Sequence, residues 1–563
     1  MAVHKVKRGD RVYLSEYKKI RDGKKVKSIF VRYLGTENQI TGGITPKRCV
    51  LDKVQLSRSY RAGDVRLLWR IAQDLDFVGI IDRICCQESY VEGVSPGKFL
   101  TIWAINRAID PESCTQLERW VPTTDLPMLA GIEPELFTKD AFLSSLDFVC
   151  YHEYASNRLV DHTASLDEAL YRRWRRIHPL PPGDKEIVAY DLTSVLFFGV
   201  SCPIAELGYN PKHINRRQVN LALLVSKWDR YPLSHFVYNG SRNTVSTVKN
   251  LLARLIDTAV EPGTLIWDRA NVTGDHVKLV ETAGWRLICG VPKNLKEVQN
   301  IIKSAGIQPS PSTFVHKSKS EHIYAIRVSG RLFGRERSVV VYENQERRTG
   351  DVNALNEVLA EIGKQLDLVS EKGKGWSEAQ LHREIDDIAE SWKDYLRIRV
   401  TRKGNGARIL WKFRKQAIED VKRSYGRYVL FSTDEDLSAE SVVKSYFEKD
   451  FVEKVFRILR TDEEIEPVRH RLEPRVRAYM FVCVLAYRLL SVLQAYLQKV
   501  AEKGEVWERT FDLLSELGRV ERVDVGFGKE MRMWYLNKTK YIEDTLKSLG
   551  MKDLLKEEIK FNV

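Results

Sequence analysis

The sequence predicts an α/β protein whose core is a mixed β-sheet covered by helices. Three segments rich in β-branched and aromatic residues follow one another at Glu186–Phe198, Val219–Ser226 and Leu233–Tyr238, as in an antiparallel meander. Two further short strands, Gly263–Asp268 and Trp285–Val291, then alternate with segments of helical periodicity. Antiparallel strands followed by alternating strands and helices are typical of a mixed sheet with helices on its faces.

Length and composition place this sheet inside a larger globular chain. With 563 residues the chain is too long for a single hydrophobic core and should divide into several domains. A hydrophobic fraction of 43% and a charged fraction of 29% exclude an intrinsically disordered protein. The net charge of +14 favours a polyanionic partner.

The division into regions follows changes in composition along the chain. A Pro- and Gly-rich linker at Pro179–Asp184 separates a mainly helical part from the predicted sheet. We expect six regions: a basic β-rich module at 1–60, a helical region at 61–184, the first part of the core at 185–295, an α+β insertion at 296–427, the second part of the core at 428–500 and a C-terminal helical region at 501–563.

The positive charge is concentrated at the N-terminus. Residues 1–34 hold eleven Lys and Arg residues against three acidic residues, which gives a net charge of +8. The apolar segments Val12–Leu14 and Ile29–Val31 flank Asp22-Gly23, a pair typical of a hairpin turn. We therefore expect a small folded module, with a solvated basic tail as the alternative.

A second basic segment closes the helical region. Tyr171–Arg176 holds four arginines and two aromatic residues at a predicted helix end. Such a cluster could lie along a phosphate backbone. The alternative is a surface helix whose long side chains reach solvent past an apolar stem.

Cysteine usage and hydropathy disfavour two classes of protein. The eight cysteines show no CxxC pair and no histidine at metal-ligand spacing, so we expect reduced cysteines in a cytoplasmic protein and no structural zinc. The longest apolar run, Ala478–Tyr487, is far shorter than a membrane span, and no signal peptide opens the chain. A membrane protein is not expected.

One helical segment near the C-terminal end groups its polar side chains. On a single helix at about 100° per residue, Tyr446, Lys449, Glu453 and Arg460 would share an arc about 60° wide above an apolar stripe. An ordinary amphipathic helix with a solvated face is the alternative. Two other acids compete with Glu453: Asp450 falls near the same arc at about 40°, and Glu448 falls on the wrong face at about 200°.

Two isolated aspartates lie on the predicted strands. Asp191 interrupts an apolar strand, and Asp268 stands where a short strand passes into a loop. A buried carboxylate costs several kcal/mol unless a cation or hydrogen bonds neutralise it. Either aspartate alone would be interpreted as a structural residue that caps an element or forms an ion pair. Together with Glu453, the two suit a pair of hard divalent cations.

These segments resemble the DDE transposases of prokaryotic insertion sequences, with an RNase H-like core and a Y-(2)-R-(3)-E-(6)-K signature. The interval of 77 residues from Asp191 to Asp268, and of 185 from Asp268 to Glu453, leaves room for the insertion that such transposases carry. The matching segments are Tyr190–Gly199, Gly208-Tyr209, Arg216–Leu221, Asn239–Ser241, Trp267–Asn271, Tyr446-x2-Lys449-x3-Glu453-x6-Arg460, Glu466–His470 and Arg475–Ala486.

The resemblance implies roles for individual residues. Asp191, Asp268 and Glu453 would be catalytic and bind two Mg²⁺ or Mn²⁺ ions. Tyr446, Lys449 and Arg460 would hold backbone phosphates of the DNA. Lys449 stands where the signature has arginine, and Arg460 stands where it has lysine. Both positions keep their positive charge, but the planar guanidinium and the compact ammonium have exchanged places. Ala270 replaces a usual glycine.

The resemblance also implies partners and location. We expect a prokaryotic, cytoplasmic and nucleoid-associated transposase that acts on double-stranded DNA, both terminal repeats and target, as a homodimer or larger assembly. The basic N-terminal module, the helical region and the insertion would bind DNA. Arg269 and Asn271 could position DNA or be ordinary loop residues, whereas His213, His235 and His470 are expected to be structural or to contact phosphate. The alternatives are a non-catalytic DNA-binding derivative and a stand-alone RNase H-like nuclease.

Overall fold

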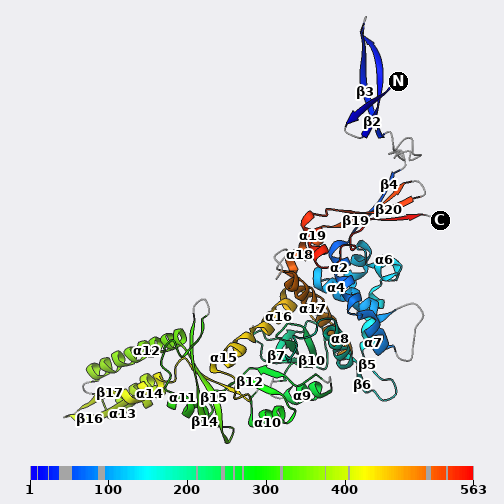
Figure 1. Ribbon diagram of the computed structural model, residues 1–563. Helices are drawn as coiled ribbons and strands as arrows, with labels where there is room; N and C mark the ends of the chain where they lie inside the picture. Colours follow the sequence, from blue (N-terminus) through cyan, green and yellow to red (C-terminus); the bar gives the residue numbers. More distant parts are fainter. Residues whose placement is uncertain are drawn as a thin grey trace.

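A large mixed sheet forms the centre of the computed structural model (Figure 1). The structure describes residues 2–8, 11–22, 25–36, 54–86, 95–210, 213–242, 247–257, 260–268, 272–317, 321–373, 376–403, 406–501, 509–527 and 530–561. Within these residues, nine strands hydrogen-bond in the order β10, β9, β7, β11, β12, β18, β15, β14, β13, and β8 pairs with β9. The α/β class predicted from the sequence is confirmed at this level.

The strand directions make the sheet mixed. β7, β11 and β12 run parallel to one another, and each other neighbouring pair is antiparallel. The bounds are β7 Ile187–Leu196, β8 Glu206–Leu207, β9 Arg217–Ser226, β10 Pro232–Asn239, β11 Thr264–Trp267, β12 Arg286–Val291, β13 Phe314–Lys317, β14 His322–Leu332, β15 Arg335–Asn344 and β18 Arg427–Ser432. Strands β7 and β9 are buried almost throughout because helices cover both faces.

Helices connect the parallel strands and cover the sheet. α9 (Val248–Asp257) lies between β10 and β11, and α10 (Gly274–Thr282) between β11 and β12, as the alternating pattern predicts. α11 (Lys296–Ser304) packs beside β14 and β18. The helices that follow β18 are α15 Ala439–Glu448, α16 Asp450–Thr461 and α17 Glu473–Ala501.

The expected insertion at 296–427 is only partly a separate unit. Its strands β14 and β15 join the main sheet, because β18 pairs with β12 on one side and β15 on the other. The rest forms a lobe with its own small core, which includes Leu366 and Leu381. The elements of this lobe are α12 Gln345–Lys372, α13 Glu378–Ala389, β16 Leu396–Lys403, β17 Gly406–Phe413 and α14 Lys415–Lys422.

The region after residue 61 is mainly helical, as its periodicity predicts. Its helices are α2 Gly63–Asp74, α3 Phe77–Cys85, α4 Pro96–Ile109, α5 Cys114–Trp120, α6 Leu126–Ala130, α7 Lys139–Val149 and α8 Thr163–Ile177, and the short strands β5 Cys150–His152 and β6 Leu159–Asp161 form a pair. In the described part of the chain, α17 is the one helix long and apolar enough to cross a membrane. However, 89% of its most apolar window is buried inside the protein.

The basic cluster at the end of α8 belongs largely to the interior. Tyr171 and Trp174 are buried, and the Arg175 guanidinium pairs with Glu186 and Asp229. This part of the cluster joins α8 to the main sheet and is not a free phosphate-binding surface.

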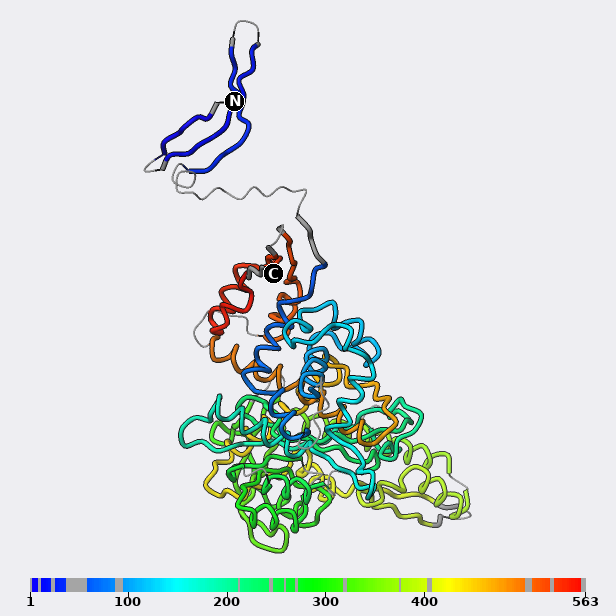
Figure 2. The backbone as a smooth tube through the Cα atoms, turned by 90° about the vertical axis from the view of Figure 1, so that its right-hand side faces the viewer, coloured from blue at the N-terminus to red at the C-terminus, as the bar shows by residue number. Residues whose placement is uncertain are grey.

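Two small sheets lie near the chain ends. β1 Ala2–Arg8, β2 Arg11–Asp22 and β3 Lys25–Thr36 form an antiparallel sheet, which includes the predicted hairpin. β4 Val54–Arg61 pairs instead with β19 Glu521–Phe527, which continues to β20 Glu530–Leu536 and β21 Glu558–Phe561. Figure 2 shows this N-terminal strand beside the C-terminal segment. The expected boundary at residue 60 therefore falls within a strand of a second sheet.

The C-terminal region is not purely helical, because the strands β19, β20 and β21 lie within it. In the described part of this region, the helices α18 Thr510–Leu517 and α19 Lys540–Ser548 flank the strands β19 and β20. β19 and β20 form an antiparallel pair. A β-strand from the N-terminal part of the chain completes its sheet.

Candidate active site

The two aspartates lie side by side on neighbouring parallel strands. β7 and β11 pair in register, with Tyr190 opposite Trp267. Asp191 follows Tyr190 within β7, and Asp268 directly follows Trp267, the last residue of β11, so the register brings the two aspartates to the same level of the sheet. Neighbouring strands are about 4.8 Å apart. Two carboxylates that are 77 residues apart in the chain thus share one position across the sheet.

The surroundings of Asp191 carry an excess of negative charge. Its side chain is half-buried, and its Oδ1 accepts a hydrogen bond of 2.8 Å from the backbone N–H of Leu192. Burial raises the pKa of Asp191 to about 6, and the carboxylates of Asp268 and Glu453 add to this effect. Only the Leu192 N–H and Lys449 act in the opposite direction among the main causes. The three acids predicted from the sequence are therefore electrostatically coupled.

Asp268 is held by two side chains at the end of α15. The Tyr446 hydroxyl donates a hydrogen bond of 2.9 Å to Asp268 Oδ1, and Lys449 Nζ lies 3.4 Å from the same oxygen. The Lys449 ammonium also lies 5.1 Å from the centre of the Tyr446 ring. Burial and the nearby Asp268 charge raise the pKa of Tyr446, so its hydroxyl remains a donor. Tyr446 thus orients one of the two sheet carboxylates.

The segment 446–460 is two helices and not the single helix assumed from the sequence. α15 ends at Glu448 and α16 begins at Asp450, with Lys449 between them. The Lys449 N–H bonds to the Tyr446 carbonyl at 3.4 Å, a three-residue turn that replaces the regular helical bond. As a result the arc drawn on one helical wheel does not describe the site. Tyr446 is buried, whereas Glu453 is exposed.

Glu453 is better placed than its two rivals. It lies in the first turn of α16, which packs against β7, the strand of Asp191. It is among the main charges that raise the pKa of Asp191, and Asp450 is not. Glu448 points away to an ion pair with Lys227. Of the three acids, Glu453 is therefore the one whose charge is among the main causes that act on Asp191.

Arg460 is anchored to the strand that carries Asp191. Its guanidinium donates to the Thr193 hydroxyl and, at 3.5 Å, to the Ser194 carbonyl. Its Nε is buried and has no hydrogen-bond acceptor among the described residues. A buried donor without a partner is costly, so this nitrogen is suited to an acceptor such as a phosphate oxygen.

The loop after α16 fixes the helix against the sheet. Glu466 Oε1 accepts a hydrogen bond of 2.9 Å from the Leu196 N–H at the end of β7. Two residues further along each segment, the Phe198 N–H donates to the Val468 carbonyl at 2.7 Å. These bonds hold the segment Glu466–His470 beside β7, the strand that carries Asp191.

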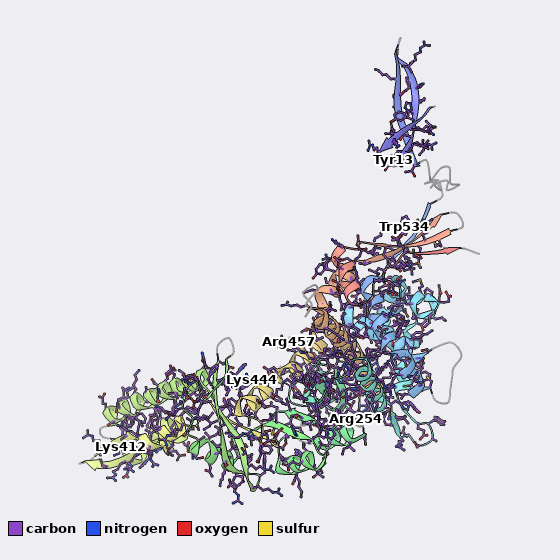
Figure 3. The ribbon with its side chains drawn as sticks, in the orientation of Figure 1. Tyr13, Arg254, Lys412, Lys444, Arg457 and Trp534 are labelled. Carbon is purple, nitrogen blue, oxygen red and sulfur yellow. The ribbon has the colours of Figure 1, made fainter. Side chains whose placement is uncertain are left out.

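Several residues of the site were not found from the sequence. Thr193 and Ser194 hold Arg460, and their positions two and three residues after Asp191 were the available signal. Lys454 and Arg457 are exposed on the same helix as Glu453, and Figure 3 shows Arg457 on this segment. Their spacing of one and four residues from Glu453 could have marked them as further cations.

The donor set fits hard divalent cations in its chemistry. Carboxylate oxygens are the ligands that Mg²⁺ prefers, and the raised pKa of Asp191 shows negative charge that a cation would neutralise. Within the described residues, no three His, Cys, Asp or Glu side chains already form a metal-binding group. Lys449 Nζ, beside Asp268, supplies the positive charge there.

Other candidate residues lie outside this arrangement. Arg269, Ala270 and Asn271 fall outside the described residues. His235 is buried against Asp167 at 2.8 Å. His470 is half-buried beside Trp103, and loss of solvent around the ring lowers its pKa to about 4.

Comparisons with known proteins add a distant likeness. No protein-family model matches the chain, and no curated protein matches it. Among solved structures, the chain is similar to the piggyBac transposase in a cryo-EM structure of its synaptic complex with hairpin DNA. The sequence identity is 10%, the TM-score is 0.39, and the alignment covers 83% of this chain and 81% of that chain. A likeness this distant carries no argument about the site.

Proposed function

We propose that this chain is a DNA transposase with an RNase H-like core, in which Asp191, Asp268 and Glu453 are the catalytic acids. One observation carries the proposal. The register of β7 and β11 sets Asp191 beside Asp268, and α16 brings Glu453 to the same strand. The sheet order, with an antiparallel meander on one side of β7 and parallel strands on the other, supports the proposed core.

The proposed chemistry is phosphoryl transfer on DNA. Two Mg²⁺ or Mn²⁺ ions held by the three acids would stabilise the attacking and leaving oxygens of an in-line displacement. Tyr446 keeps the Asp268 carboxylate oriented through its hydroxyl. The guanidinium of Arg460 and the ammonium of Lys449 would bind phosphate oxygens of the DNA backbone.

The proposed substrate is double-stranded DNA, both the ends of a mobile element and its target. Cleavage at the ends would release 3′-hydroxyls that are then joined to the target. The proposed setting is prokaryotic and cytoplasmic, with at least two protomers in the complex. A stand-alone nuclease would cut DNA without joining it, and a non-catalytic derivative would bind without cutting.

The test uses the purified full chain and the DNA that flanks its own gene. A linear fragment with both flanks is incubated with supercoiled plasmid and Mg²⁺, and joined products are sequenced. We expect Asp268→Asn to reduce joining about 100-fold or more, because removing one anionic ligand costs several kcal/mol of transition-state stabilisation.

Asp450→Asn is the matched control, since Asp450 is an exposed acid at the start of the same helix as Glu453. It should retain most of the activity. Cutting without joining would favour the nuclease. Equal activity of Asp268→Asn and the unaltered chain would overturn the assignment of the site.

A further inference from the structure

The N-terminal sheet has one face covered with aromatic rings. The register places Tyr17 opposite Phe30 and Ser15 opposite both His4 and Tyr33. Side chains opposite each other, and those two residues apart on β2, share a face. The aromatic face is defined here by five rings from three strands: His4, Tyr13, Tyr17, Phe30 and Tyr33.

The rings on this face form two groups in close contact. The ring centre of Tyr17 lies 4.6 Å from that of His4 and 5.6 Å from that of Phe30. Tyr13 and Tyr33 are 6.2 Å apart. Figure 3 shows Tyr13 on this sheet, and Figures 1 and 2 both draw the sheet apart from the other sheets.

The rings are accessible and accompanied by cations. Phe30 is 55% exposed and Tyr33 is 53% exposed, which is unusual for side chains of this size. The same face of β2 continues from Tyr17 to Lys19 and Arg21 at steps of two residues, and both cations are exposed. On this face of β2, the aromatic side chains are therefore followed by two exposed cations.

The opposite face has a different character. It carries the buried side chain of Leu14 and a Glu16–Arg32 ion pair at 2.7 Å. Ile29 lies on this face, opposite Lys18, and is 51% exposed. The concentration of rings is therefore a property of one face and not of the whole module.

We propose that the aromatic face binds single-stranded nucleic acid, with bases stacked on the rings and phosphates on Lys19 and Arg21. The net charge of +8 in residues 1–34 favours a polyanionic partner. The cores of protein interfaces are depleted of such charge. A duplex offers its phosphates, but its bases are stacked and unavailable to five rings, whereas unpaired bases stack on aromatic side chains.

This inference goes beyond the transposase proposal and does not depend on catalysis. Binding is measured with the full chain in EDTA, where metal-dependent cleavage cannot occur. The probes are a fluorescent 15-nucleotide oligo-dT and a hairpin duplex of the same charge, followed by fluorescence anisotropy. Failure here would leave the proposed active site untouched, because the joining assay reports on that site separately.

Phe30→Ala and Ile29→Ala form a matched pair on one strand. Both remove an apolar side chain of similar exposure, but from opposite faces. We expect Phe30→Ala to weaken oligo-dT binding about 5-fold to 100-fold, since stacking contributes about 1–3 kcal/mol per base. Ile29→Ala should change it less than 2-fold, and Phe30→Trp should restore it.

Three results would overturn the proposal. One is an equal loss of oligo-dT affinity in Phe30→Ala and Ile29→Ala. Another is a loss of duplex affinity as large as the loss of oligo-dT affinity in Phe30→Ala, which would indicate a duplex contact. The third is unchanged oligo-dT affinity in a Phe30→Ala/Tyr33→Ala double variant with unchanged circular dichroism, which would assign the face to another kind of partner.

Discussion

Two aspartates of this protein, one fully buried and one half-buried, have pKa values that are shifted in opposite directions. Asp167 on α8 is fully buried, and Arg488, Arg254 and His235 surround it. Burial by itself would raise the pKa of Asp167, but these partners outweigh it and hold the pKa below its ordinary value. Asp191 has acids as neighbours, and its pKa rises to about 6.

The two aspartates differ in the charges that act on them: cations surround Asp167, whereas two acids and one cation are among the main charges near Asp191. The Asp167 cluster joins α8, β10 and α17 through contacts such as the 2.7 Å pair with Arg488, and cations within the fold offset the Asp167 charge. Around Asp191 the fold leaves negative charge unmatched. Strongly perturbed carboxylates with unmatched charge are typical of sites that bind a cation or a substrate.

The largest expected effect comes from removing the charge of Asp167. Asp167→Asn leaves Arg488 buried without its counter-charge, and breaking such a pair costs about 3–5 kcal/mol of unfolding free energy. Chemical denaturation at pH 7.5 should show a lower midpoint. Glu440→Gln is the control, because the Glu440–Lys444 pair on α15 is half-exposed. Similar midpoints for the two variants would mean that the Asp167 cluster is not structural.

A smaller effect of the opposite sign is expected at Asp191. Its pKa is raised from 3.8 to about 6, so the folded state binds the proton more tightly and loses stability as pH rises between these values. Asp191→Asn should therefore raise the unfolding free energy at pH 7.5 in EDTA. Two pKa units, reduced for partial exposure, correspond to about 2 kcal/mol.

The gain should shrink as the pH is lowered toward 5, because Asp191 then carries its proton in the folded protein. Thermal unfolding at several pH values measures this. Asp450→Asn, at an exposed acid, should show no such gain. A loss of stability in Asp191→Asn at pH 7.5 would contradict the picture of unmatched charge.

The smallest effect is expected from Tyr446→Phe, which removes the hydroxyl that bonds to Asp268 and keeps the ring. Groups that orient a metal ligand contribute about 10-fold or more to metal affinity. We expect Mn²⁺ binding, followed by the signal of free Mn²⁺ in magnetic resonance, to weaken about 10-fold. Tyr151→Phe, on β5, serves as the control. Unchanged Mn²⁺ affinity would contradict a role of Tyr446 in orienting the metal ligand and would leave only its proposed role in phosphate binding.

Much of the core could be predicted from local patterns. The strands β7, β9, β10, β11 and β12 match the predicted segments to within a few residues, because each is a short apolar run bounded by turn residues. Ser438 caps α15, and its hydroxyl accepts a hydrogen bond of 3.1 Å from the Ser441 N–H. These features depend on residues close together in the chain.

Long-range pairing could not be predicted in the same way. The register of β4 with β19 joins residues more than 450 positions apart, and the pairing of β15 with β18 draws the insertion into the main sheet. The break at Lys449 carries no proline or glycine signal. It follows from the packing of α15 and α16 against different strands of the sheet.

The sequence by itself determined the class of fold and the charge of the N-terminal module, and it led to the prediction of the three acids. Those properties depend on residue type and on periods of two to four residues. Only the tertiary structure decided that Asp191 and Asp268 share a register position, that Tyr446 bonds to Asp268, and that the rings of the first sheet share a face. The physical reason is that strand register and helix docking are set by side-chain packing across the whole chain.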